Sequence, residues 1–150
     1  MPDLDKFAGT RGEPFTMPIE RGKVREFARA TRAQHPAFLE DTNPTIPPTF
    51  LMTAVYWQEP RHFALGGLRL DIHRGLQAGQ AFTFHGPPPR AGDQLTALQR
   101  VDSVEHKTGR RGGDLTFIAI VTEFRDPTGA LRAESRTTLV QTSHAVGAGI

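Results

Sequence analysis

The 150-residue sequence contains no cysteine. This absence excludes disulfide bonds, thiolate catalysis and cysteine-based zinc sites. An excess of charge of one sign is also lacking, because 18 Lys and Arg residues stand against 16 Asp and Glu residues. Nucleic-acid binding needs clustered basic residues with interleaved aromatics. The one short basic cluster, at residues 107–111, falls short of this, so we expect no nucleic-acid partner.

Long apolar runs are absent as well. No stretch approaches the about 18 apolar residues that a membrane helix needs. The first residues, MPDLDKFAGTRGEPF, have neither the apolar core nor the cleavage pattern of a signal peptide. The histidines at 62, 73, 106 and 144 have no HxxxH or HxH spacing, so we expect no metal site. The expectation is a cytoplasmic protein without membrane contact.

What is present fits a soluble globular chain, with 37% hydrophobic and 23% charged residues. The length predicts one domain over residues 1–150. We expect loose ends at about residues 1–12 and 143–150, because neither end has a clear period.

The first half of the chain predicts helices and loops. Residues 22–32 carry apolar side chains at the spacing of one helix face, and Pro36 must end that helix. The apolar run 49–57, which follows a proline-rich loop at 41–48, predicts a buried helix, with a strand as the weaker alternative. Residues 13–21 predict a short strand whose prolines confine it to an edge or an end.

From about residue 80 the pattern changes to that of strands. Residues 80–86 and 130–142 alternate apolar and polar side chains, and 115–124 is apolar on both faces, as in a covered central strand. Residues 94–107 form a long strand whose apolar phase slips after Leu98, which predicts a bulge. Helices followed by strands joined through hairpins indicate an α+β layer fold.

These residues resemble the MaoC-like dehydratases, and more narrowly their N-terminal-domain or fatty-acid-synthase-I-like subfamily. The resemblance covers residues 13–142 and rests on these segments: "VREFARAT", "PPTFL" (47–51), the Phe84-His85-x-Pro87 strand, the "AGD" turn (91–93) and "KTGRRG". It implies a hot-dog fold, in which an antiparallel sheet wraps a long central helix, usually in a dimer. It also implies a coenzyme A or acyl-carrier-protein thioester as substrate, with no cofactor.

Active members of this family carry an Asp/His pair in the form Asp-x-Asn-Pro-x-His. Because dehydration takes one proton and gives another, it requires two proton-transfer groups. On this chain the proline matches Pro36, the Asp position falls on Ala33, the Asn position on His35 and the His position on Phe38. Neither Ala33 nor Phe38 can transfer a proton. The resemblance therefore implies a subunit that binds the acyl chain and lacks its own acid–base pair.

The resemblance leads to six candidate substrate-binding residues: His35, Phe38, Thr49, Phe50, Arg110 and Arg111. Backbone N–H groups at Thr49 and Phe50 would face the thioester oxygen, and the two arginines would hold phosphates or an acidic carrier protein. His35 is a weak candidate catalyst. Three readings stay open: a partner of a catalytic hot-dog subunit, an active hydro-lyase or thioesterase using His35, and a non-catalytic acyl-binding homodimer.

Overall fold

One antiparallel sheet of five strands dominates the computed structural model, which describes residues 3–66, 68, 70–71, 73–109 and 113–143. The strands follow the order β1-β3-β4-β5-β2 across the sheet. Their bounds are β1 Phe15–Pro18, β2 Gly75–Phe84, β3 Gln94–Thr108, β4 Asp114–Arg125 and β5 Leu131–Thr142. The helical segments are η1 Asp5–Phe7, α1 Arg21–Ala30, α2 Pro36–Leu39, η2 Phe50–Trp57 and η3 Pro60–His62. The predicted α+β fold is confirmed.

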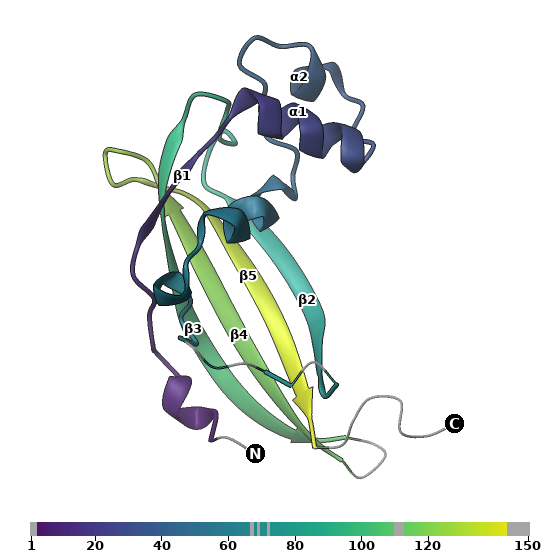
Figure 1. Cartoon of the computed structure of the whole chain (residues 1–150), viewed down its shortest axis with the longest axis vertical. Coiled ribbons are helices and arrows are strands. Elements are labelled where there is room, and N and C mark those ends of the chain that lie inside the picture. The colour runs from purple at the N-terminus through teal and green to yellow at the C-terminus, as the bar shows by residue number, and fades with distance from the viewer. Residues whose placement is uncertain (1–2, 67, 69, 72, 110–112, 144–150) are drawn as a thin grey trace.

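The helices α1 and α2 lie beyond one end of the sheet, η2 lies over one of its faces, and η1 lies beside the β3 edge (Figure 1). We call the covered side the inner face. On β4 its residues are Thr116, Ile118, Ile120, Thr122 and Phe124, because alternate side chains of a strand point the same way.

Two clusters of buried apolar residues fill the space above the inner face. The first joins α1, β1 and η2 to the α1 end of the sheet and contains Phe50, Leu51, Met17, Leu95 and Phe124. In it the ring of Phe27 on α1 meets the ring of Phe50 edge-on, with centroids 5.4 Å apart. The second cluster covers the opposite end and contains these residues: Leu4, Ala64, Leu65, Val101, Ile118 and Ile120.

The central helix differs from the prediction. Residues 49–57 were expected to begin a long central α-helix, but η2 is a 3-10 helix of 8 residues. Proline rings before and after the run limit its length, at Pro47-Pro48 and at Pro60. The segment buries Phe50, Leu51 and Ala54 and exposes its other side. Exposed fractions there reach 39% for Met52, 49% for Val55 and 81% for Tyr56.

The start of the chain also differs from the prediction of a loose end. Leu4 is buried, at 3% exposure. The segment after it bonds to the edge of β3, with Gly9 N–H donating to Val101 O at 3.0 Å and Gly12 N–H donating to Gln99 O at 3.0 Å. Leu4 and Phe7 hold the segment because they place two apolar side chains on one side of a single helical turn. At the other end, residues 144–150 lie outside the described part of the chain.

The long strands agree with the sequence pattern, and the bulge lies slightly later than predicted. The register of β3 against β4 shifts between Val101 and Ser103, so Asp102 is the extra residue, whereas the apolar phase slips after Leu98. No helix among the described residues is long and apolar enough to cross a membrane.

Candidate functional site

An apolar groove lies between η2 and the inner face of the sheet. Its volume is about 530 Å³, within the range of about 300–1,000 Å³ typical of small-molecule sites. Its roof comes from η2 and the segment after it: Leu51, Met52, Ala54, Val55, Gln58, Phe63, Leu65, Gly66, Leu68 and Leu70. Its floor comes from three strands: Gln99, Ile120, Thr122, Phe124, Ser135, Thr137 and Leu139.

The strand register explains why polar residues form part of the floor. Thr122 pairs with Gln99 on one side and with Ser135 on the other, so the three side chains form one row across the inner face. The Gln80 amide donates to Ser135 Oγ at 2.7 Å and accepts from Thr137 Oγ1 at 2.7 Å. These groups therefore satisfy one another within the protein.

Among the described residues, none that lines the groove carries an ionisable side chain. This described lining therefore suits an uncharged, mostly apolar ligand and offers no ionisable group for proton transfer in catalysis. The Gln58 Nε2 atom is buried in the roof without a hydrogen-bond partner. Within the described lining it is the one buried side-chain polar atom without a partner, and it offers a donor to a ligand oxygen.

The segment that carries the candidate acid–base positions lies at the surface between α1 and α2. His35 is exposed, and its Nδ1 accepts a hydrogen bond from the Ala37 N–H at 3.2 Å, so the ring caps the first turn of α2. The His35 and Phe38 rings lie 5.7 Å apart. Neither residue lines the groove. Their roles in substrate binding stay predictions.

Thr49 and Phe50 begin η2, as the sequence indicated, and the structure gives their backbone groups partners. Phe50 N–H donates to Pro47 O at 3.0 Å, and Thr49 O accepts from Met52 N–H at 3.1 Å. Phe50 is fully buried in the first cluster. Thr49 is exposed and has no side-chain cap bond. A thioester contact at these two residues stays a prediction, and Leu51 is the first residue of the run to reach the groove.

The arginines proposed to hold phosphates, Arg110 and Arg111, lie outside the described residues. The neighbouring Lys107 is described and has local partners. Its Nζ lies 3.3 Å from Glu105 Oε2 and 4.9 Å from the centroid of the Phe117 ring.

Two charged groups of the sheet with shifted pKa values, Asp102 and Arg100, lie outside the lining of the groove. A hydrogen bond from Arg100, and a second from Arg136, lower the pKa of Asp102. The bond to Asp102 in turn raises the pKa of Arg100. Among the described residues no group of three or more His, Asp or Glu side chains could hold a metal ion.

Sequence reasoning missed the floor of the groove. The alternation in residues 130–142 places Ser135 and Thr137 on one face of the strand. Nothing in the sequence indicated that these two side chains would line a cavity. It also missed the buried His62, whose Nδ1 accepts from Glu59 N–H at 2.8 Å. The only signal for His62 was its place between Pro60 and the apolar residues that follow.

Comparison with known proteins identifies the family. The model described as the FAS1-like dehydratase domain region matches residues 6–134. A UPF0336 protein of Streptomyces griseus is 29% identical over 130 residues, which cover 81% of this chain and 83% of that protein. A UPF0336 protein of Streptomyces coelicolor is 30% identical over 116 residues, covering 71% and 77%.

Solved structures agree. The C-terminally truncated HadBC complex of Mycobacterium tuberculosis, a 3R-hydroxyacyl-ACP dehydratase, contains a chain with 30% identity and a TM-score of 0.65, with 89% of this chain and 96% of that chain covered. A MaoC-like dehydratase has 25% identity and a TM-score of 0.74, covering 93% and 43%. The ChsH1-ChsH2 complex of M. tuberculosis, at 13% identity and a TM-score of 0.67, covers 97% and 90% and shares the fold. The hot-dog fold is thus confirmed.

Proposed function

Because this chain belongs to the FAS1-like dehydratase family, we propose that it is the acyl-binding subunit of a (3R)-hydroxyacyl-thioester dehydratase, or enoyl hydratase. The observation that carries the proposal is the pair Ala33 and Phe38, at the positions where the motif of active members has Asp and His. A methyl group and a phenyl ring transfer no proton. Hydration of an enoyl thioester needs two such transfers, so the catalytic groups come from another chain.

The groove supports an acyl chain as the ligand. Its described lining is uncharged and mostly apolar, and it runs beneath η2 along the strands of the inner face. A long central helix would pack over this face, whereas η2 has only 8 residues. The space left beneath a short helix can hold an alkyl chain, whose burial contributes about 0.8 kcal/mol per methylene.

A second hot-dog subunit is the proposed partner. The strand β2 forms one edge of the sheet and is 10 residues long, whereas β1 at the other edge has 4 residues and ends in a proline. No strand of the described chain pairs with the outer side of β2, and such an edge can accept a strand from another chain. The similar HadBC structure is itself a complex of subunits, which supports a heterodimer.

The His35 alternative is weakly supported. A general acid or base must come within hydrogen-bonding reach of the substrate, but the Nδ1 of His35 is occupied by the Ala37 N–H. Within the described residues no carboxylate lies at salt-bridge distance from His35 to form a second transfer group with it.

The test is reconstitution. The purified chain is assayed for hydration of trans-2-enoyl-CoA, alone and after mixing with a hot-dog subunit that carries an intact Asp-x-Asn-Pro-x-His motif from a neighbouring reading frame. We expect no hydration by the chain alone and hydration by the mixture. Mixing with a partner whose Asp and His are replaced is the control and should give none.

The His35→Ala variant separates the rival readings. In the mixture we expect this variant to retain activity. Hydration by the chain alone that His35→Ala abolishes would contradict the proposal and favour an active enzyme. Acyl-CoA binding without complex formation or activity would instead favour a non-catalytic homodimer. Thiol release would indicate a thioesterase.

A further inference from the structure

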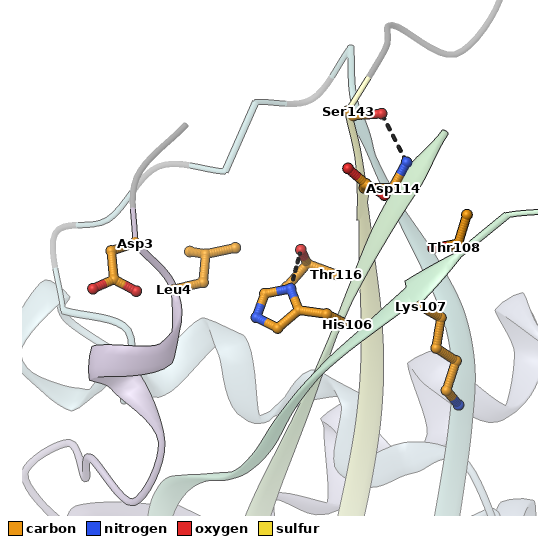
Figure 2. Close-up of a pocket in the computed structure, with 8 residues that line it drawn as sticks. All are labelled: Asp3, Leu4, His106, Lys107, Thr108, Asp114, Thr116 and Ser143. Carbon is orange, nitrogen blue, oxygen red and sulfur yellow. Dashed lines mark hydrogen bonds between the residues drawn. The ribbon is translucent and has the colours of Figure 1, made fainter. Parts of the chain in front are cut away.

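A second cavity lies on the same inner face as the groove, at the end of the sheet away from α1, where β3 ends and β4 begins. Its volume is about 440 Å³. Its lining contains Asp3, Leu4, His106, Lys107, Thr108, Asp114, Thr116 and Ser143 (Figure 2). Four of these side chains are ionisable (two carboxylates, one imidazole and one amine), so this cavity differs in character from the described lining of the groove.

The strand register places the two cavities in line. The groove extends along β4 from Phe124 to Ile120. Ile118 is the next inner-face residue, and Thr116 after it lines the second cavity. Thr116 lies four positions before Ile120, which is about 13 Å along a strand. An acyl chain that follows the strands past Ile118 would therefore enter the second cavity.

Leu4 lies in the space between them. It lines the second cavity, and it packs in the cluster that contains Leu65 and Ile120, both of which line the groove. In Figure 2 the Leu4 side chain lies between the N-terminal segment and the pair His106–Thr116. Ile118, fully buried in the same cluster, forms the floor at this point.

Hydrogen bonds on two sides hold the N-terminal segment that carries Leu4. On one side, Asp5 Oδ1 lies 2.8 Å from His106 Nε2, and His106 Nδ1 lies 3.2 Å from Thr116 Oγ1. On the other, Thr10 Oγ1 donates to Ala64 O at 2.8 Å. The N-terminal segment is thus tied both to the rim of the second cavity and to the segment that forms the roof of the groove.

We propose that Leu4 is the end wall of the acyl groove and sets the longest acyl chain that the groove accepts. This inference rests on the proposed function and names its substrate class: an acyl thioester whose hydrocarbon chain ends at Ile118. The wall coincides with the change from an uncharged lining to one with carboxylates and imidazole, so an apolar chain gains little beyond it.

The experiment measures chain-length dependence of binding with the full-length chain. Dissociation constants are determined by calorimetry for saturated acyl-CoA thioesters from octanoyl to tetracosanoyl, each below its micelle concentration. Affinity should rise about fourfold for each methylene that is buried, until the chain reaches the wall and the affinity stops rising. Leu4→Ala removes three carbon atoms from the wall. The chain length at which the affinity stops rising (the plateau) should therefore increase by about two to three methylenes. Leu4→Val removes one carbon atom and should increase this chain length by about one methylene.

The matched control is Leu95→Ala. Leu95 is also buried, at 1% exposure, but unlike Leu4 it lines neither cavity and does not belong to the second cluster, which contains Leu65 and Ile120. We expect this variant to lose stability without moving the plateau. If Leu4→Ala fails to fold, Leu4→Val carries the test alone.

The outcomes are distinguishable. A plateau that stays in place in the Leu4 variants, or an equal loss of affinity at every length, overturns the role of Leu4. If the wild-type chain binds acyl-CoA of no length, the proposed function fails first and the inference fails with it.

Discussion

Ala33 donates its backbone N–H to the carbonyl of Ala28 at a distance of 2.8 Å. The N–H of Arg32 donates to Arg29 O at 3.2 Å, and Arg32 itself is left-handed, with φ of 56°. This pair of bonds is the Schellman motif, which ends helices and usually has glycine at the left-handed position. It fixes the residue that stands at the family's aspartate position directly behind the end of α1.

Arg32→Gly should stabilise the protein. A left-handed residue with a Cβ costs about 1–2 kcal/mol, and glycine removes most of that cost, so we expect the free energy of unfolding to rise by about 1 kcal/mol. Urea denaturation of the variant and the wild type measures this change in the free energy of unfolding. Arg32→Ala is the control, because it removes the guanidinium but keeps the Cβ. Equal stability of the two variants would show that the left-handed conformation is not the cause.

Gly12→Ala should destabilise the N-terminal segment. A Cβ at this position would lie 2.0 Å from the backbone O of His62, so the two backbones must separate, at a cost of about 3 kcal/mol. In Gly22→Ala, on α1, the new Cβ meets nothing within 4 Å, and we expect a gain of about 0.5 kcal/mol. Thermal unfolding compares the two variants. A small effect at Gly12 would argue against the close approach of Gly12 to the backbone of His62.

Gln141→Met should stabilise the fold slightly. Gln141 is 4% exposed, and its Oε1 is buried without a partner. Because an unpaired buried polar atom costs about 1–3 kcal/mol, an apolar side chain of similar size should raise the free energy of unfolding by about 1 kcal/mol.

The matched substitution is Gln80→Met. It breaks the bonds to Ser135 and Thr137 and leaves those hydroxyls unpaired, so we expect a loss of about 2 kcal/mol. The two variants should therefore move the urea midpoint in opposite directions. A lower urea midpoint in both variants would mean that the unpaired oxygen of Gln141 does not destabilise the fold.

Asp102→Asn should make stability less dependent on acid pH. The hydrogen bond from Arg100, then that from Arg136, lowers the pKa of Asp102 in the folded state. The unfolded chain therefore takes up the proton first as the pH falls below about 4. The stabilisation is complete above that pH and is lost as the pH falls through the folded-state pKa.

The measurement is the urea midpoint of both proteins between about pH 7 and about pH 3. The wild type should be the more stable at neutral pH, and the difference should shrink as acid is added. Because the carboxylate is partly exposed, salt should reduce the difference at neutral pH. A difference that is constant over the whole range would contradict ionic stabilisation by Asp102.

The sequence predicts the strands well because their signal is local. In β4 the apolar side chains on both faces mark a covered strand, and the prolines near β1 mark an edge. The type of η2 could not be predicted, because its run is apolar on all sides and carries no helical period. Leu4 could not be placed either, since its burial depends on a sheet whose strands lie about a hundred residues later.

The site is predicted only in part, for a similar reason. The motif positions Ala33, His35 and Phe38 can be read directly because the family motif is contiguous. The groove consists of residues from η2 and three strands, and its volume depends on how short η2 is. Phe50 begins the helical run as expected, but its N–H is already bonded within the chain.

The 3-10 winding of η2 has a kinetic consequence. Runs of 3-10 helix longer than about four residues are uncommon, because their hydrogen bonds have poorer geometry than those of an α-helix. We therefore expect the amide hydrogens of Phe50–Trp57 to exchange with solvent well before those of β4. Transient unwinding of η2 would uncover the groove from above while the strands beneath it stay paired, so ligand entry need not wait for any movement of the sheet.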